Sequence, residues 1–244
     1  MQKEMDHFVN DSMTATDTTI GTEAREWQAF FERKDYPREY QGNPAIVREI
    51  KSLFDTLEGR ALLEVGPGSG VDSARLAEAG ARSYVVDPTS IALQRIQQSY
   101  RDKIDCIQGD GFSLPFADGT FDLVFSQGLL EHFPDPIQML EEQIRVTRRG
   151  GFVIVDVPQT YSLWTVKKKV MQAMGKWFVS YETQYSERRL RKLIRRVPSI
   201  RTIRMYGHKL CPSLLPQPRG EFFERSWLAR HMCVSIGIIV QRTV

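Results

Sequence analysis

The chain is predicted to be an α/β protein built on a mostly parallel sheet with helices on both faces. Short runs rich in β-branched and other apolar residues alternate with helical segments of about ten to fifteen residues. A glycine-rich turn follows the first of these runs, at residues 66–70. Because parallel strands need crossover connections of this length, the alternation favours right-handed βαβ units.

Composition excludes several other classes. The 244 residues carry 33 Lys+Arg and 30 Asp+Glu, and 41% are hydrophobic, as in an ordinary globular protein. At roughly 150 residues per domain, this length predicts one domain with additions. The three cysteines, Cys106, Cys211 and Cys233, are far apart, so we expect no disulfide framework and no metal site. We find no signal peptide and no apolar run of the roughly 18–20 residues that span a bilayer, and we expect a cytoplasmic protein.

The N-terminal region divides into two parts. Residues 1–22 are polar and are expected to form a flexible tail, whereas residues 23–58 show helical spacing up to Leu57 with a break at Asp35-Tyr36-Pro37. Its aromatic residues are expected either to form a lid over a cleft or to pack on the sheet. They are Trp27, Phe30, Phe31, Tyr36 and Tyr40.

The central region supplies five strands and three helices. The strands are expected at 61–65, 83–86, 104–108, 121–126 and 152–157, and the first two helices at 73–79 and 91–100. Asp135 is the expected N-cap of the third helix, with Pro136 at its first position and Gly150-Gly151 closing it.

The C-terminal third is strongly basic. Between Thr165 and Met205 there are twelve Lys/Arg against two acids, a local charge of +10 in a chain of net charge +3. We expect a long basic helical stretch here, then strands near 202–205 and 234–241 separated by a proline-rich loop.

The glycine-rich turn is the first candidate for chemistry. Glycines at 66, 68 and 70 allow a sharp turn and a close approach of the backbone to a ligand. The free N–H groups of the helix that follows suit an anionic group. Val71 stands where a dinucleotide-binding motif has its third glycine, and no Gly-Lys-Ser/Thr is present. A turn made of glycines for steric reasons alone is the alternative.

Acidic residues at the ends of three successive strands strengthen the binding hypothesis. Glu64 precedes the glycines, Asp87 ends the second strand about twenty residues later, and Asp110 follows the third. A carboxylate in the place of Asp87 can accept both hydroxyls of a ribose. Because the carboxyl ends of parallel strands meet at one edge, these residues predict a nucleoside-type ligand there.

The sequence resembles the class I S-adenosylmethionine-dependent methyltransferases, particularly the group that methylates quinones and small metabolites. The matching stretches are LLEVGPGSG, VVDPTS, GDGFSLPFADGTFDLVFSQGLLEHF and IRVTRRGGFVIVDVP, within about 59–159. The resemblance implies a Rossmann-like, seven-stranded sheet of order 3-2-1-4-5-7-6 with strand 7 antiparallel. It also implies a methyltransferase domain over 59–244 that contains a basic insert at about 161–198. Pro67 and Arg148-Arg149 depart from the family's usual residues without affecting the expected cofactor site.

The resemblance also assigns roles to individual residues. The methionine end of S-adenosylmethionine would lie along Glu64, Gly66, Gly68 and Gly70, the ribose at Asp87, the adenine at Asp110, Gly111 and Phe112, and the sulfonium side over Gln127. His132 follows the fourth strand and is the candidate general base; the alternative is that it only organises its loop.

The predicted function is transfer of a methyl group from S-adenosylmethionine to a small-molecule oxygen or nitrogen nucleophile. One alternative is a membrane-associated quinone or lipid-linked acceptor, and another is a non-catalytic scaffold with a vestigial cleft. The sequence makes no prediction of the oligomeric state.

The basic segment 163–196 has three interpretations: an interfacial helix on anionic lipid, a pocket for an anionic small molecule, or a solvated cover for the site. The arginine-rich stretch 188–196 would suit a phosphate-rich partner. Nucleic acid is disfavoured, since the fourth strand ends Ser126-Gln127-Gly128-Leu129 and lacks the Asn/Asp-Pro-Pro-aromatic run of base-amine methyltransferases.

Overall fold

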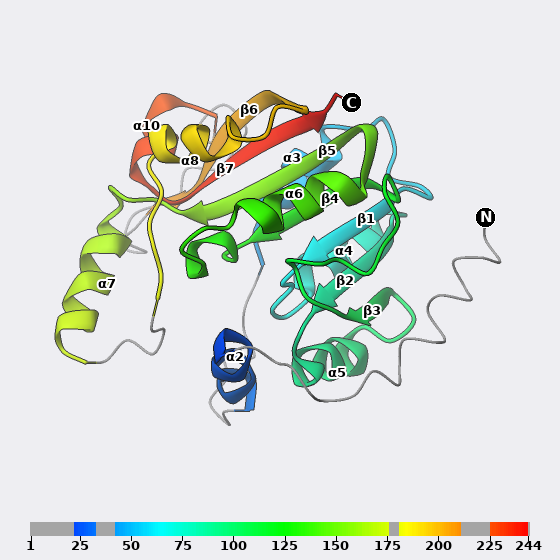
Figure 1. The fold of residues 1–244 in the computed structure, drawn as a ribbon, viewed down its shortest axis with the longest axis horizontal. Helices are drawn as coiled ribbons and strands as arrows, with labels where there is room; N and C mark the ends of the chain where they lie inside the picture. Colours follow the sequence, from blue (N-terminus) through cyan, green and yellow to red (C-terminus); the bar gives the residue numbers. More distant parts are fainter. Residues whose placement is uncertain (1–21, 33–41, 176–180, 211–224, 244) are drawn as a thin grey trace.

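The computed structural model describes residues 22–32, 42–175, 181–210 and 225–243. They form a seven-stranded sheet of order β3-β2-β1-β4-β5-β7-β6, which confirms the predicted topology (Figure 1). The strand β7 is antiparallel to both of its neighbours, and the pairs among β1 to β5 are parallel. The strands are β1 (Ala61–Val65), β2 (Arg82–Asp87), β3 (Ile104–Gln108), β4 (Phe121–Gln127), β5 (Thr147–Pro158), β6 (Ile200–Leu210) and β7 (Cys233–Arg242).

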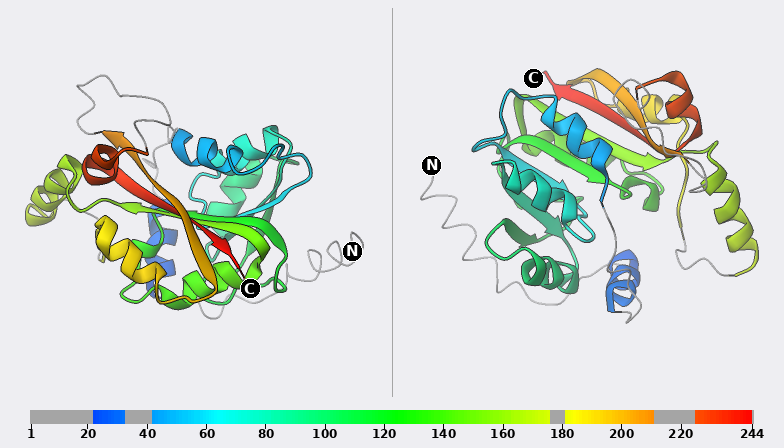
Figure 2. Two further views of the ribbon diagram at one scale, coloured as in Figure 1. Left: turned by 90° about the horizontal axis from the view of Figure 1, so that it is seen from above. Right: turned by 180° about the vertical axis from the view of Figure 1, so that it is seen from behind.

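Helices cover both faces of the sheet. One face carries α3 (Pro44–Lys51) and α4 (Val71–Glu78), and the opposite face carries α6 (Ile137–Val146) and α8 (Glu187–Ile194) (Figures 1 and 2). The helix α5 (Ser90–Ser99) packs on β3 and β2, and α2 (Thr22–Glu32) packs on α5. The remaining elements are the 3₁₀ turn η2 (Leu130–His132), α7 (Leu163–Ala173) and α10 (Trp227–Met232).

Alternation along β5 shows why the fold has three layers. Val153, Val155 and Val157 belong to the apolar cluster under α6 and α8. Ile154 points the other way, into the cluster that holds α3 and α4. All four are at most 1% exposed, so both faces of this strand are buried, as expected for a central strand.

The helix α3 is shorter than the predicted helical segment. Asn43 caps its start by accepting hydrogen bonds from the amides of Ala45 and Ile46, and Pro44 occupies the first position. It ends at Lys51, although the helical spacing of apolar residues continues to Leu57. Beyond the helix Leu57 still enters the core, which explains why its spacing was misleading.

The prediction for α6 was wrong at both ends. Asp135 is not the N-cap, because that position belongs to Pro136, and the helix ends at Val146. Gly150 and Gly151 lie inside β5, where the pairing with β4 shifts register. Gly150 has a positive φ of 73°, and a Cβ on Gly151 would lie 2.7 Å from the Asp122 carbonyl oxygen. These glycines therefore permit an irregularity in the strand rather than stop a helix.

Several predictions fall outside the described residues: the tail before residue 22, Tyr36, Tyr40, the proline-rich loop and Cys211. The division at residues 22, 58 and 161–198 stays a prediction. Within the described part of the chain, none of the helices has the length and apolar character required to cross a bilayer.

Candidate functional site

The carboxyl ends of β1, β2, β4 and β5 bring the polar residues of the site together. Glu64 of β1 pairs with Val85 of β2 and with Phe125 of β4, and Gln127 pairs with Asp156 of β5. Since these strands are parallel, their last residues share one edge of the sheet. The structure therefore brings Glu64, Asp87 and Gln127 to one edge of the sheet and adds Asp156. Asp110, the third acid of the predicted set, lies beyond β3 and is exposed.

The glycine-rich turn leaves β1 along this edge. Gly66, Gly68 and Gly70 have positive φ values of 68°, 55° and 69°, which residues other than glycine rarely adopt. A Cβ on Gly68 would meet nothing within 4 Å, whereas one on Gly66 would lie 2.9 Å from Leu129. Gly70 is the N-cap of α4. The turn thus presents bare backbone beside the start of a helix.

A buried hydrogen-bond network holds Glu64. Ser73 Oγ donates to Glu64 Oε2 at 2.6 Å. The amide of Gln127 donates through Nε2 to Glu64 Oε1 at 3.2 Å and to Asp72 Oδ2 at 2.8 Å. Gln127 therefore bridges two carboxyl groups, and its orientation is set by both.

Burial, and to a lesser extent the nearby Asp72 carboxylate, raises the pKa of Glu64 to about 8. Burial also raises the pKa of Asp72, against the hydrogen bonds from Gln127 and the Asn43 amide. Two desolvated acids sharing one amide create a site that favours positive charge. A cationic group bound beside them would restore both to their ionised forms.

Sequence reasoning missed Asn43, Asp72 and Asp156. The amide N–H of Asn43 donates to both Asp72 oxygens, at 3.0 and 2.8 Å, and its side-chain Nδ2 lies 3.5 Å from Asp156 Oδ2. Burial raises the pKa of Asp156 to about 6. An acid in the first turn of α4 and one at the end of β5 were visible signals. The position of Asn43 depends on a contact across 29 residues that the sequence does not show.

Asp87 lies at the end of β2 and is 7% exposed. Its Oδ1 accepts hydrogen bonds from the amide N, at 2.8 Å, and from the hydroxyl of Thr89. Burial raises its pKa against these two hydrogen bonds. Thr89 thus engages Oδ1, and Oδ2 has no hydrogen-bond partner among the described residues.

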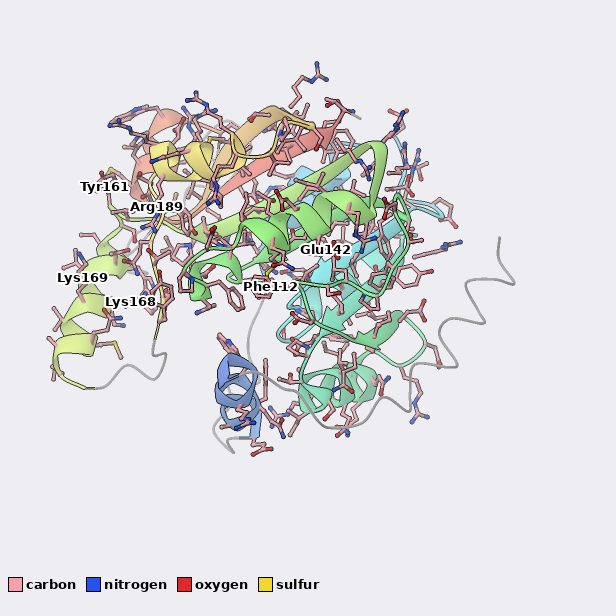
Figure 3. The ribbon with its side chains drawn as sticks, viewed as in Figure 1. Phe112, Glu142, Tyr161, Lys168, Lys169 and Arg189 are labelled. Atoms are coloured by element: carbon pink, nitrogen blue, oxygen red, sulfur yellow. The ribbon has the colours of Figure 1, made fainter. Side chains whose placement is uncertain are left out.

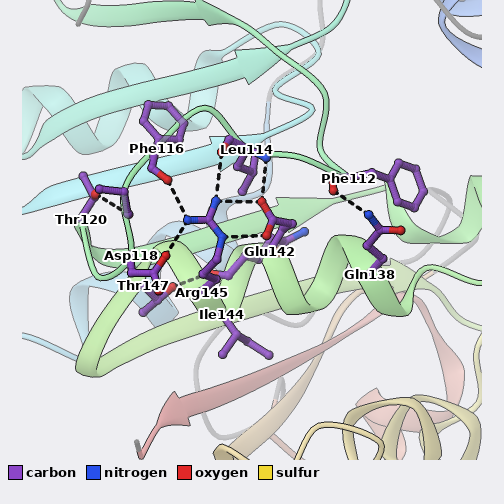
Figure 4. Close-up of polar contacts among 12 residues, drawn as sticks. Phe112, Leu114, Phe116, Asp118, Thr120, Gln138, Glu142, Ile144, Arg145 and Thr147 are labelled. Carbon is purple, nitrogen blue, oxygen red and sulfur yellow. Dashed lines mark hydrogen bonds and ion pairs between the residues drawn. The ribbon is translucent and has the colours of Figure 1, made fainter.

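Asp110, Gly111 and Phe112 lie in the turn after β3. Asp110 Oδ1 accepts from the Phe112 amide at 2.9 Å, and the Phe112 ring meets the Phe133 ring edge-on at 4.9 Å. Gln138 donates to the Phe112 carbonyl oxygen at 3.1 Å (Figure 4). A Cβ on Gly111 would lie 3.1 Å from Met139, so the turn packs closely on α6.

Arg145 fixes the loop that continues from this turn. Its guanidinium donates to the carbonyl oxygens of Leu114 and Phe116 at 3.0 and 2.8 Å, and it pairs with Asp118 and Glu142 (Figure 4). The Leu114 amide in turn donates to Glu142 at 2.8 Å. The loop is therefore held by α6 through charged hydrogen bonds, a role that sequence spacing did not indicate.

His132 is buried in η2, just beyond β4. Its Nδ1 lies 3.2 Å from the Tyr181 carbonyl oxygen, and its Nε2 lies 3.9 Å from Glu131 Oε1. Burial lowers its pKa below the usual 6.5. A carbonyl partner at Nδ1 favours the tautomer with the proton there, which leaves Nε2 able to accept one. This geometry is compatible with either interpretation of His132.

An additional ionic cluster adjoins His132. Lys168 of α7 pairs with Glu182 at 2.5 Å, and their side chains are 1% and 8% exposed. Glu131 is fully buried, and burial with the charges of Glu182 and Asp156 raises its pKa well above the usual value. The Thr183 amide donates to the Glu131 carbonyl oxygen. Lys168 belongs to the basic segment 163–196, and none of the three interpretations of that segment predicted this buried pair.

The N-terminal aromatic residues reach the site in part. The Trp27 ring of α2 meets the His132 ring edge-on at 4.9 Å, and Phe31 is 5% exposed. The side chain of Phe30 lies outside the described residues. Whether α2 acts as a lid stays a prediction, but it does contact the candidate base.

The basic insert resolves into two different helices. In α8, Leu190, Leu193 and Ile194 enter the main core, so this helix is part of the fold. In contrast, α7 extends away from the sheet, with Tyr161, Lys168 and Lys169 far from Phe112 (Figure 3). Among the described residues no group of three or more His, Cys, Asp or Glu could hold a metal ion.

Comparison with known proteins places this geometry in context. Residues 63–155 match the family described as "Methyltransferase domain". An uncharacterized methyltransferase of Mycobacteroides abscessus is 36% identical over 112 residues, which are 44% of this chain and 42% of that protein. An uncharacterized methyltransferase of Mycobacterium sp. strain JLS is 35% identical over 143 residues, which are 55% of this chain and 54% of that protein. The chain thus matches about half, or less, of the length of these relatives.

Solved structures share the fold at low identity. A putative methyltransferase solved with the Haloferax volcanii Trm112 activator has a TM-score of 0.68 at 18% identity, covering 91% of this chain and 98% of its own. The magnesium protoporphyrin IX methyltransferase of Synechocystis, solved with bound S-adenosylhomocysteine, has a TM-score of 0.59 at 16% identity, covering 99% and 95%. The resemblance to class I methyltransferases drawn from the sequence is confirmed by the matching domain and by the fold.

Proposed function

We propose that this chain, whose residues 63–155 match a methyltransferase domain and whose sheet has the class I strand order, transfers a methyl group from S-adenosylmethionine to a small-molecule oxygen or nitrogen nucleophile. The observation that carries the proposal is the pair of carboxyl groups at adjacent strand ends. Glu64 lies at the end of β1 with a raised pKa, and Asp87 lies at the end of β2. The glycine-rich turn at residues 66–70, whose glycines carry no side chains, follows Glu64 at this edge of the sheet.

The residues at this edge fit the chemistry of S-adenosylmethionine. Space is open beside Gly68, where a Cβ would meet nothing within 4 Å. The hydroxyl of Ser69 in the same turn is buried and has no hydrogen-bond partner among the described residues. The desolvated pair Glu64 and Asp72 suits the positive charges of the methionine end, and Asp87 suits two ribose hydroxyls.

In the proposed mechanism the chain acts mainly by orientation. The cofactor supplies a methyl group already activated by its positively charged sulfur. Glu64, Gln127 and the glycine turn would hold the methionine end and Asp87 would hold the ribose, which would fix the direction from which an acceptor approaches. Proximity and orientation of this kind can contribute about 7–11 kcal/mol.

His132 is the candidate that receives a proton from the acceptor. It is neutral near pH 7 because burial lowers its pKa, and the Tyr181 carbonyl oxygen orients its ring. The Trp27 ring meets the His132 ring edge-on at 4.9 Å, and the His132 side chain is 9% exposed. A nucleophile that is already deprotonated would need no such base.

The proposal is tested by calorimetric titration of the full chain with S-adenosylmethionine and, separately, with NAD. We expect micromolar binding of the first ligand, no binding of the second, and loss of binding in Asp87→Ala. Exchange of Glu78 for Gln serves as a matched control, since that acid is exposed and pairs with Lys103 on another surface. Absence of binding, or binding that is unchanged in Asp87→Ala, contradicts the proposal.

A second candidate function is transfer to a membrane-associated acceptor such as a quinone or a lipid-linked molecule. The specific observation in its favour is the exposed apolar face of α7, which begins five residues after β5 ends. A non-catalytic scaffold is the remaining alternative. It predicts that S-adenosylmethionine binds and that no S-adenosylhomocysteine forms with any acceptor.

A further inference from the structure

The large apolar side chains that face solvent are concentrated at one end of the molecule. Among the described residues all of them lie within 161–181 and 227–232. Val166 is 59% exposed and Trp227 is 65% exposed. We call the following set the α7–α10 patch: Tyr161, Leu163, Val166, Val170, Met174, Trp227, Leu228 and Met232.

The two helices of the patch leave the same edge of the sheet. Gln159, at the end of β5, donates from its amide N to the Val234 carbonyl oxygen and from Nε2 to the Arg230 carbonyl oxygen of α10. All views show α7 and α10 at the same end of the sheet (Figures 1 and 2). The exposed residues of both helices therefore lie at one end of the molecule.

The helix α7 presents its apolar stripe to the outside. Leu163, Val166, Val170 and Met174 recur at spacings of three and four, so they share one face of the helix. All four are more than 50% exposed. The opposite face buries Thr165, which donates from its hydroxyl to the Gln159 carbonyl oxygen, and Lys168, which pairs with Glu182.

The rotation of α7 about its own axis is fixed by its N-cap and by a buried ion pair. Ser162 caps the start of α7 by accepting a hydrogen bond from the Thr165 amide, and the buried Lys168–Glu182 pair sets its rotation. Rotating α7 so that Val166 and Val170 faced the protein would break the Lys168–Glu182 pair. One buried charge would then be left without its partner. The outward apolar face is therefore held in place for another surface to cover.

The charge around the patch is positive. The helix α7 contains no acidic residue, and its Lys167 and Lys169 are exposed. Lys167 Nζ lies 5.1 Å from the centre of the Trp164 ring. The neighbouring α8, joined to α10 by the Arg230–Glu187 pair, adds further exposed cations. They are Arg188, Lys192 and Arg195.

The charge distinguishes the possible occupants. In a two-fold dimer through α7 the same patch would face itself, so lysines would meet lysines with no acid on the helix to offset them. An anionic bilayer complements both parts of the patch. Its acyl chains would contact the apolar stripe, and its negative headgroups would contact the flanking lysines. We infer that the α7–α10 patch docks the protein on the surface of an anionic lipid membrane. This inference concerns binding only and stands apart from the proposed methyl transfer.

The test is co-sedimentation of the full chain with phosphatidylcholine vesicles prepared with and without phosphatidylserine. The wild-type chain is expected to bind the anionic vesicles and not the neutral ones. The pair Lys167→Gln and Lys169→Gln is expected to weaken binding about 25-fold, at about fivefold for each cation near the surface. Val166→Ser with Val170→Ser is expected to weaken it by about tenfold or more for each inserted side chain.

Matched controls keep the test specific. Lys51 and Arg101 are exposed on other surfaces, so Lys51→Gln with Arg101→Gln removes the same charge and is expected to leave binding unchanged. Circular dichroism checks that each variant retains the fold; all substituted side chains are exposed.

Four results would overturn the inference. The first is no binding of the wild-type chain to anionic vesicles, and the second is an equal loss in the control pair, which indicates net charge alone. The third is loss in the lysine pair with none in the valine pair, as expected for electrostatic adsorption without insertion of the apolar stripe. The fourth is a dimer by light scattering that the valine pair abolishes, which assigns the patch to a second copy of this chain.

Discussion

Replacing Glu64 with glutamine is expected to stabilise the fold at neutral and alkaline pH while weakening binding at the candidate site. Glu64 is 0% exposed, and its pKa is raised from 4.5 to about 8, chiefly by burial. The folded protein therefore retains a proton that the unfolded chain loses. Glutamine keeps the shape and accepts from Ser73 or Gln127 through its carbonyl oxygen, without a charge to ionise.

The magnitude follows from proton linkage. Because the folded state binds more protons than the unfolded state between pH 4.5 and about 8, ionisation of Glu64 lowers stability as pH rises through this window. The loss is about 1.4 kcal/mol per pH unit within the window. By pH 7 it amounts to about 3 kcal/mol relative to strongly acidic solution, as an upper limit.

Urea unfolding of both proteins at several pH values across this window measures the effect. The free energy of unfolding of the wild-type chain should fall more steeply with pH than that of Glu64→Gln, since the other buried acids contribute equally to both. Glu78→Gln is the control and should retain the wild-type slope, because Glu78 is exposed and its pKa is lowered by Lys103. Parallel slopes for Glu64→Gln and the wild type would refute the reasoning.

Three further expectations follow from the same site. Asp87→Asn should weaken S-adenosylmethionine binding by about 10–100-fold in calorimetry, through loss of charged hydrogen bonds; unchanged affinity contradicts the ribose role. His132→Ala should lower kcat by about 100-fold or more at unchanged ligand affinity. Because the pKa of His132 is lowered, its titration should not change the wild-type rate above pH 6.5. Near-normal turnover of the variant would leave His132 a structural role. Lys168→Met should cost about 3–5 kcal/mol of unfolding free energy by stranding Glu182, and adding Glu182→Leu should recover most of it; an additive double variant would show that the pair is not coupled.

Much of the fold could be predicted because its signals are local. The strands β1 and β2 are short apolar runs that end in glycines or an acid. A run of this kind fits few structures other than a buried strand. Boundaries that depend on distant contacts could not be predicted. The glycines at 150 and 151 resemble a helix stop, but their role depends on the backbone of Asp122 in the neighbouring strand.

The candidate site divides in the same way. Glu64 and Asp87 were predictable since strand ends are visible in the sequence and parallel strands share an edge. The partners of Glu64 were not, because Gln127 reaches both Glu64 and Asp72 only after β4 lies beside β1. The partner of Lys168 could not be predicted either, because nothing in the run of three lysines shows that the middle one meets Glu182.

The chain that returns from α7 has a consequence for how distant substitutions should be interpreted. Residues 181–185 touch the candidate base through the Tyr181 carbonyl oxygen, η2 through the Thr183 amide, and the end of β5 through the Tyr185 amide. The same short segment carries Glu182, which anchors α7. This segment is thus shared by α7 and by the loop that carries His132. A substitution that shifts α7 is therefore expected to shift His132 as well, even where the substituted residue lies far from that ring.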